Sequence, residues 1–398
     1  MNTRKYFQKI KWLYKDIQPF RRVTAHITLL FFTTLRRIKI WPKQQEANIW
    51  IIGEAHGECQ PDNGFYFFQY CTRKHPNKDV YFVTRKKSLP KNERFSRKNI
   101  INYGSVRHII IYLKSTVCFY THTHSDIIFR EMFHRKKSSK KLIFLHHSTL
   151  GFKKFDNRYV KNRNSMDIFT IGSNTEYDIL KNNIGVDSHR LKVTGYARYD
   201  TLSNKCTENT IQIAYMPTHR DWLRMSENEF ANSDFYKHVK NFILSPTLHK
   251  LLENYNAVLK IRLHPANIRF SYLLPKTHPS IQLIDHKNET PLDLIRGSHI
   301  LITDYSGVAF DFIYLNKPVL FYRFDIDEYI RSRSSYINLR DSRFGDIYYN
   351  YNSLIQGLRN TISNNCKTDK NRQSMRDEFM PKMDHKNCDR IYKIVVSK

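Results

Sequence analysis

Residues 300–310 read Ile-Leu-Ile-Thr-Asp-Tyr-Ser-Gly-Val-Ala-Phe, an apolar run followed by a short polar turn and a second apolar run. This pattern predicts a β-strand that ends at Thr303 and a helix over Val308–Tyr314. In open α/β sheets, ligands bind beyond the carboxyl ends of the strands. The hydroxyl groups of Thr303 and Ser306, with the N–H groups of the first helical turn, could bind an anion there. Ordinary helix capping by Asp304 or Ser306 is the alternative.

Apolar runs of similar length recur along the chain, and polar or helical segments separate them. In the first half they predict strands at Asn48–Ile52, Val80–Val83, Ile109–Leu113, Val117–Tyr120, Leu142–Leu145, Ile168–Ile171 and Leu191–Val193. In the second half they predict strands at Ile211–Tyr215, Ala257–Ile261, Ile281–Ile284, His299–Ile302 and Pro318–Tyr322. Alternation of strands and helices is typical of parallel sheets. We therefore expect an α/β fold of two Rossmann-type domains with a cleft between them, formed by residues 47–204 and 205–398.

The composition restricts the possible partners. The chain has 66 Lys and Arg against 36 Asp and Glu, a formal net charge of +30, and 40% of its 398 residues are hydrophobic. It can therefore bury a core, which excludes a disordered polyelectrolyte. The charge favours a polyanionic partner: nucleic acid, an anionic membrane or a phosphate-bearing substrate. We expect no nucleic-acid partner, because the sequence has no helix-turn-helix, zinc-finger or RNP-like motif. The motifs GxGxxG, GxxxxGK[ST] and GxSxG are also absent from the sequence.

Residues 1–46 form a basic N-terminal region with eleven Lys or Arg against two acidic residues. Phe7, Ile10, Tyr14 and Ile17 recur at helical spacing, which predicts an amphipathic helix. A basic amphipathic helix suits an anionic membrane surface, although an ordinary surface helix packed on the core gives the same pattern. No run reaches the roughly 18 apolar residues of a membrane-spanning helix, so none is expected.

Three further predicted strands end in histidine or arginine side chains. The strand at 142–145 leads into His146 and His147, and the strand at 211–215 leads into Met-Pro-Thr-His-Arg220. After the strand at 257–261, alternation places Arg262 and His264 on one face. Separately, His122 and His124 with Asp126 could ligate a metal, but a lone His-x-His is more often part of a loop or core.

Residues 301–322, LITDYSGVAFDFIYLNKPVLFY, closely resemble the signature of the CDP-glycerol glycerophosphotransferase family, the teichoic-acid-type polyol-phosphate transferases. Three other segments resemble further motifs of this family in the same order. LHHSTLGFKK (145–154) is similar to its QHG…K segment, YMPTHRD (215–221) to its APTWR segment, and RLHP (262–265) to its R-x-HP segment. VTGYARYD (193–200) resembles a further segment of this family less closely. The chain departs from the pattern at four positions: His146 replaces Gln, Ser148 replaces Gly, His219 replaces Trp, and Gly307 replaces the second Ser of D-Y-S-S.

The resemblance implies a GT-B-like fold whose parallel sheets face each other across a cleft. It also implies transfer of a polyol phosphate from a CDP-activated donor to a hydroxyl group of a growing wall or capsule polymer. Residues 47–204 would bind the acceptor and residues 205–398 the donor. Phosphoryl transfer needs an aligned nucleophile and positive groups around the phosphoryl oxygens.

The resemblance assigns roles to individual residues. His147 would be the general base on the acceptor hydroxyl, and an ordinary histidine pKa near 6.5 would suit that role. His264, with Arg262, would stabilise or protonate the departing phosphate. The remaining donor-side residues would be Thr218, Arg220, Thr303, Ser306 and Gly307. Acceptor-side candidates are His146, Lys153 and Lys154, although both lysines could simply face water.

The implied partners are a CDP-glycerol or other CDP-polyol donor, a lipid-linked glycan or polyol-phosphate acceptor, and an anionic membrane surface. The expected location is the inner face of a bacterial plasma membrane. No cofactor or metal site is predicted, and a requirement for a divalent metal stays open. The alternative function is that of a GT-B glycosyltransferase that uses a nucleotide sugar.

Overall fold

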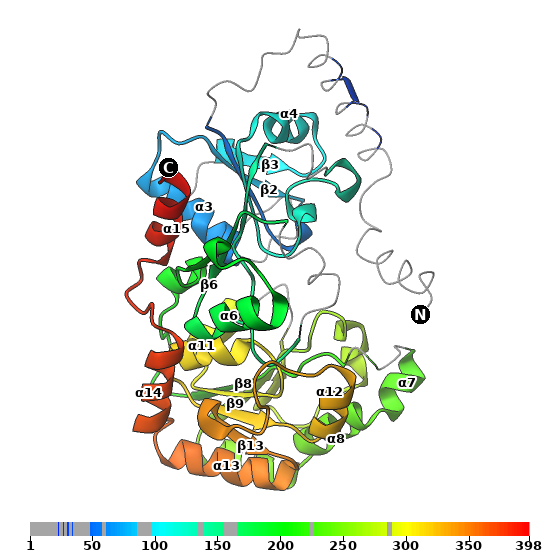
Figure 1. Cartoon of the computed structure of the whole chain (residues 1–398). Helices are drawn as coiled ribbons and strands as arrows, with labels where there is room; N and C mark the ends of the chain where they lie inside the picture. The colour runs from blue at the N-terminus through cyan, green and yellow to red at the C-terminus, as the bar shows by residue number, and fades with distance from the viewer. Residues whose placement is uncertain are drawn as a thin grey trace.

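The computed structural model describes residues 48–397, with gaps at 58–60, 86–96, 134–138, 155–164, 221, 223–225 and 285–288, together with Val23, Ile27, Leu30, Phe31 and Thr34. The predicted helix through Phe7 and Ile17 lies outside the described residues. The described chain forms two parallel β-sheets with helices, one above the other in Figure 1.

The first sheet contains seven strands in the order β3-β2-β1-β4-β5-β6-β7, and every pair is parallel. The strands are β1 (Trp50–Gly53), β2 (Val80–Thr84), β3 (Ile100–Asn102), β4 (Val117–Tyr120), β5 (Lys141–Phe144), β6 (Ile168–Ile171) and β7 (Leu191–Val193). β1, β4 and β6 are buried throughout. Their continuous apolar sequences arise because helices and loops cover both faces of a parallel sheet.

The second sheet contains six parallel strands in the order β10-β9-β8-β11-β12-β13. They are β8 (Ile211–Tyr215), β9 (Ala257–Ile261), β10 (Ile281–Leu283), β11 (Ile300–Thr303), β12 (Val319–Tyr322) and β13 (Asp346–Tyr348). The strand order reverses between β8 and β11, as it does between β1 and β4 in the first sheet. Ligands of doubly wound sheets bind at such reversal points.

The helices lie on both sheets. They are α3 (Asn63–Lys74), α4 (Val106–Lys114), α6 (Asn174–Asp178), α7 (Glu227–Asn232), α8 (Asp234–Ile243), α9 (Pro246–Asn254), α10 (Pro291–Gly297), α11 (Val308–Tyr314), α12 (Ile326–Ser332), α13 (Tyr351–Ser363), α14 (Lys370–Phe379) and α15 (Asn387–Val396). Short helical turns that bear on the site are η1 (Ala55–Gly57), η3 (His124–Asp126) and η8 (Ala197–Thr201).

The predicted α/β fold with two parallel sheets is confirmed, and one predicted strand is wrong. Ile109–Leu113 lies in α4, whose N-terminus is capped by the Ser105 side chain accepting from the His108 backbone N–H. A short apolar run suits a buried strand or a helix equally well, and the capping serine favours the helix here. The short strands β3 and β13 were not predicted, because neither carries a long apolar run.

The last helix, α15, returns to the first sheet. It lies beside α3 in the upper half of Figure 1, whereas α13 and α14 lie in the lower half. The Tyr70 hydroxyl donates to Asp389 at 3.1 Å, and the rings of His75 and Tyr392 stack at 3.6 Å. Asp200 accepts from the backbone N–H groups of Asn387 and Cys388, both at 2.8 Å. We therefore propose domain limits near residues 47–204 and 205–380, with α15 belonging to the first domain.

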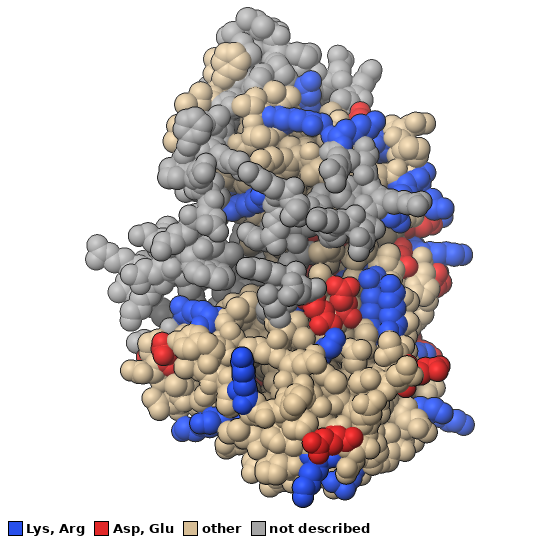
Figure 2. Space-filling model, turned by 180° about the vertical axis from the view of Figure 1, so that it is seen from behind, with Lys and Arg blue, Asp and Glu red and all other residues tan. Residues whose placement is uncertain are grey.

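Positive charge does not gather in one place on the face shown in Figure 2. On the face shown in Figure 2, Lys and Arg side chains lie on both halves, with Asp and Glu among them. Among the described residues, no helix combines the length and the apolar character needed to cross a membrane.

Candidate active site

The predicted base, His147, lies in a sharp turn directly after β5. His146 has a positive φ of 58°, which is uncommon for a residue with a side chain, and it is buried, whereas His147 is exposed. The His147 Nδ1 atom lies 3.2 Å from the carbonyl oxygen of Thr121. A carbonyl oxygen only accepts, so Nδ1 carries the hydrogen and Nε2 keeps its lone pair. His147 is therefore held in the tautomer that can accept a proton through Nε2.

A second imidazole, that of His122, stacks on His147, with ring centres 4.1 Å apart and planes 13° apart. The loop that carries His122 is fixed by Asp126, whose buried carboxylate accepts from the backbone N–H groups of His56, Thr121 and His122 at 2.8–3.0 Å. The surrounding protein and the neighbouring His122 lower the pKa of His147 below its ordinary value. The pKa of His147 therefore lies below the expected value near 6.5, and the imidazole is neutral at pH 7.

The His122–His124–Asp126 group does not form a metal site. Within the described residues, no cluster of three His, Cys, Asp or Glu side chains is arranged to hold a metal. The carboxylate of Asp126 is engaged by backbone N–H groups, and the His124 ring stacks on Phe133 at 4.1 Å. These residues shape the loop beside His147 instead.

Arg220 does not reach outward as predicted. It is 1% exposed, and its guanidinium group contacts Asp325 at 2.6 Å, Asp304 at 2.7 Å and the carbonyl oxygen of Thr218 at 2.6 Å. Asp304 also accepts from the Thr218 backbone N–H at 2.9 Å. Arg220 therefore connects the loops after β8, β11 and β12, and these contacts use four of its five N–H groups inside the protein.

Thr303 and Arg262 are also engaged inside the protein. The buried Thr303 hydroxyl donates to the carbonyl oxygen of Met216 at 2.7 Å. Arg262 is 5% exposed and donates to the carbonyl oxygen of Glu289 at 2.6 Å. β9 ends at Ile261, so the strand alternation from which a shared face was predicted does not extend to Arg262 and His264. Arg262 is buried, whereas His264 is exposed.

His264 and Ser306 remain accessible. His264 is exposed, and its ring lies 5.5 Å from that of His219 in a stacked arrangement. Ser306 is half-buried, and its hydroxyl oxygen accepts from the Val308 backbone N–H at 3.3 Å. On the acceptor side, Lys153 and Lys154 are both exposed.

The turn that carries His147 packs directly against the second sheet's domain. A side-chain carbon at Gly307 would lie only 2.0 Å from the Ser148 hydroxyl oxygen, so the two turns are in close contact. Arg198 donates to the carbonyl oxygen of His147 at 3.1 Å and pairs with Asp311 of α11 at 2.8 Å and with Asp62 at 3.0 Å.

The structure thus brings His146, His147, Ser306 and Gly307 to one junction between the sheets. Thr218, Arg220, Thr303, Arg262 and His264 lie at the neighbouring strand ends of the second sheet. Sequence reasoning missed Arg198 and Asp311, which join the two halves. In the sequence, only the weak resemblance of residues 193–200 to a family segment pointed to Arg198.

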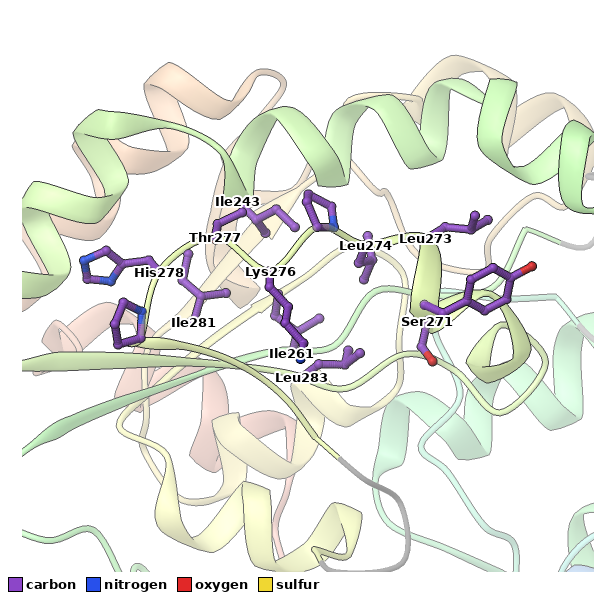
Figure 3. A pocket seen from close by; sticks show the side chains of 13 residues that line it. Ile243, Ile261, Ser271, Leu273, Leu274, Lys276, Thr277, His278, Ile281 and Leu283 are labelled. Atoms are coloured by element: carbon purple, nitrogen blue, oxygen red, sulfur yellow. The ribbon is translucent and has the colours of Figure 1, made fainter.

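A separate pocket of about 860 Å³ opens at the edge strand β10. Figure 3 shows Ile243, Ile261 and Leu274 around it, with Lys276 and His278. None of the predicted site residues lines this pocket, so we do not assign it to the candidate active site.

Buried histidines predict an acid-sensitive fold. Burial is the main cause that lowers the pKa of His108 to about 4, and its Nε2 lies 2.8 Å from the carbonyl oxygen of Ile127. Between pH 6.5 and 4 the unfolded chain therefore binds a proton that the folded chain does not. His108 alone lowers the free energy of unfolding by about 2 kcal/mol between pH 7.5 and pH 5.

Urea unfolding at the two pH values measures this loss. His108→Gln should reduce the loss by about 2 kcal/mol, while His189→Gln, at an exposed position, should leave it unchanged. Equal stability of the wild type at both pH values would contradict the prediction.

Comparisons with known proteins identify the family. Residues 39–397 match the profile of the CDP-glycerol:poly(glycerophosphate) glycerophosphotransferase family. The chain is 25% identical over 370 residues to the minor teichoic acid biosynthesis protein GgaB of Bacillus subtilis, covering 87% of this chain and 39% of GgaB. It is 29% identical over 372 residues to the teichoic acid glycerol-phosphate primase of the same organism, covering 85% of this chain and 90% of the primase.

Solved structures agree on the fold. The wall teichoic acid polymerase TagF superposes with a TM-score of 0.70 at 17% identity, covering 94% of this chain and 97% of the TagF chain. A UDP complex of S. aureus MnaA superposes with a TM-score of 0.54 at 14% identity, covering 87% and 96% of the two chains. The profile match over nearly the whole length shows that the chain belongs to the CDP-glycerol:poly(glycerophosphate) glycerophosphotransferase family.

Proposed function

We propose that this chain transfers glycerol phosphate from CDP-glycerol, or a related polyol phosphate from the corresponding CDP-polyol, to a hydroxyl group of a teichoic-acid-type acceptor and releases CMP. The observation that carries the proposal is the placement of His147. It is an exposed, neutral imidazole with Nδ1–H bonded to Thr121, at the junction between the two sheets. Family membership supplies the reaction class.

In the proposed mechanism, His147 Nε2 takes the proton of the acceptor hydroxyl while the hydroxyl oxygen attacks the phosphorus that bears glycerol. The bond from that phosphorus to the bridging oxygen breaks, and CMP leaves with the electron pair. A base positioned within hydrogen-bond reach contributes about 10²–10⁴-fold to such a step. The stacked His122 and the Thr121 carbonyl hold the His147 ring in place for it.

The second domain would bind the donor at the ends of β8, β9 and β11. His264, which is exposed, would stabilise or protonate the departing CMP phosphate. Ser306 and Gly307 would contact the donor phosphates. Arg220 acts indirectly, because its ion pairs with Asp304 and Asp325 fix the loops that carry Thr218 and Tyr305.

The acceptor would be a lipid-linked glycan or a polyol-phosphate polymer, and the chain would bind the anionic inner face of a bacterial plasma membrane. Val23, Ile27, Leu30 and Phe31 support this location. All four are helical, recur on one helical face and are 56–66% exposed. Arg21, Arg22, Arg36 and Arg37 flank them in the sequence. An exposed apolar stripe beside basic residues suits insertion at an anionic lipid surface.

Replacing Ile27, Leu30 and Phe31 together by Ser should weaken binding to vesicles that contain phosphatidylglycerol by at least about tenfold, because the apolar area that enters the lipid is lost. Co-sedimentation with vesicles measures the affinity, and pure phosphatidylcholine vesicles show the contribution of charge. Leu244→Ser with Tyr272→Ser, at exposed apolar positions of the second domain, is the matched control. Unchanged binding of the triple variant would show that these apolar side chains do not hold the chain on the membrane.

A donor panel tests the proposed reaction. CDP-glycerol, CDP-ribitol and UDP-N-acetylglucosamine are each supplied with a glycerol-phosphate oligomer, and nucleotide release is measured. Release of CMP from a CDP-polyol, with no acceptor-dependent release of UDP, supports the proposal. Acceptor-dependent UDP release alone would favour a glycosyltransferase, the function suggested by the fold shared with a UDP-binding neighbour.

A further inference from the structure

Ser148 and Gly307 share one position in space. A side-chain carbon built on Gly307 would lie 2.0 Å from the Ser148 hydroxyl oxygen and 3.4 Å from the Ser148 Cβ. The backbone of Gly307 does not require glycine, because its φ of −62° and ψ of −14° suit any residue. Position 307 is therefore restricted by Ser148, and the hydroxyl of Ser148 lies where a side chain at 307 would otherwise be.

Several other contacts hold the turn that carries Ser148 against the second domain. Arg198 donates to the carbonyl oxygen of His147 and pairs with Asp311 of α11, which links this turn to α11. The Tyr336 backbone N–H and the Ser335 hydroxyl donate to the carbonyl oxygen of Gly151 at 2.9 and 2.8 Å. The rings of Phe152 and Phe310 stack at 4.8 Å. Ser148 is thus held against Gly307 by contacts on both sides.

The two residues are also two of the four departures from the family pattern. The pattern has Gly after the histidine and Ser at the second position of D-Y-S-S, and this chain has Ser148 and Gly307. The exchange is reciprocal: one hydroxyl is lost from the second domain and one is gained from the first, at the same place. A hydroxyl group beside Ser306 is therefore preserved.

We propose that Ser148 is a donor-binding residue that supplies, from the first domain, the hydroxyl group that position 307 lacks. The Ser148 hydroxyl donates to the carbonyl oxygen of Thr149 at 3.5 Å, the outer limit of a hydrogen bond. A phosphate oxygen is a stronger acceptor, so the hydroxyl would exchange this contact for the donor. Ser148 follows His147 directly, so this bond also fixes the base relative to the donor phosphate. The inference rests on the proposed function.

Exchanging the two side chains tests the inference. Ser148→Gly should lower kcat/KM for CDP-glycerol by about 10- to 100-fold, the effect of one hydrogen bond to a charged group. Gly307→Ser alone should also lower kcat/KM, because the added side chain displaces the Ser148 hydroxyl. The double variant with both changes returns one hydroxyl to the same place and should recover most of the kcat/KM lost by Ser148→Gly. Gly297→Ala is the control, because the nearest atom to its added carbon lies 3.7 Å away.

Thermal unfolding of the same variants tests the contact without any substrate. Gly307→Ser should lower Tm, and Ser148→Gly added to it should restore Tm. Wild-type kinetics of Ser148→Gly, or a double variant no more active than Ser148→Gly, would overturn the inference. If the wild type releases no CMP from CDP-glycerol or CDP-ribitol, the proposed function fails, and the Tm values alone decide whether the two residues share one position.

Discussion

His147→Ala is expected to lower kcat for glycerol-phosphate transfer by about 10²–10⁴-fold and to change KM for CDP-glycerol little, because the variant loses the proposed base on the attacking hydroxyl. The geometry supports this role directly. Nδ1–H is bonded to the Thr121 carbonyl, which leaves Nε2 as the acceptor, and His122 stacks on the ring at 4.1 Å. Initial rates over a range of CDP-glycerol concentrations measure the effect.

His189→Ala, at an exposed position on the first domain, is the matched control and should keep wild-type kinetics. The pKa of His147 is lowered, so its basic form persists to lower pH than that of an ordinary histidine. The acid limb of kcat/KM should therefore lie below pH 6.5. A folded His147→Ala variant with a wild-type kcat would remove His147 from the mechanism.

Arg220→Leu is expected to lower the free energy of unfolding by about 3–5 kcal/mol, since it leaves Asp304 and Asp325 without their buried partner. Both ion pairs are short, at 2.7 and 2.6 Å, and Arg220 is 1% exposed. Transfer activity should fall with stability, because Asp304 also holds the Thr218 backbone N–H at the end of β8. Urea unfolding of the variant and the wild type measures the difference.

Arg343→Leu provides the comparison. Arg343 pairs with Asp341 at 2.7 Å, but its side chain is 71% exposed, so its loss should cost at most about 1 kcal/mol. If Arg220→Leu is as stable as the wild type and instead raises KM for CDP-glycerol, Arg220 contacts the donor phosphates, as the sequence first suggested.

Most strands could be predicted because a buried parallel strand is a continuous apolar run. Val117–Tyr120, Ile168–Ile171 and Ile211–Tyr215 were predicted with the bounds that the structure shows. The prediction failed at Ile109–Leu113, where an equally apolar run lies in α4, a helix whose N-terminus is capped by Ser105. An apolar run therefore predicts that a segment is buried, while capping residues beside it help to decide whether the segment forms a strand or a helix.

The chemistry of single residues was predictable, but their partners were not. The sequence shows that Arg220 follows a strand end, but only the fold brings Asp304 and Asp325 to it and turns a phosphate-binding candidate into a buried structural group. In the same way, Ser148 and Gly307 are separate departures in the sequence and one contact in the structure. Such contacts join residues that are far apart in the sequence, and the periodicity and spacing of residue types carry no information about them.

The most direct test of the proposed reaction is product analysis of the purified wild-type chain with CDP-glycerol and a glycerol-phosphate oligomer that ends in a free hydroxyl group. We predict that one CMP is released for each glycerol phosphate added to the oligomer, and that His147→Ala forms neither product. CMP release without oligomer extension, or no CMP at all, would contradict it.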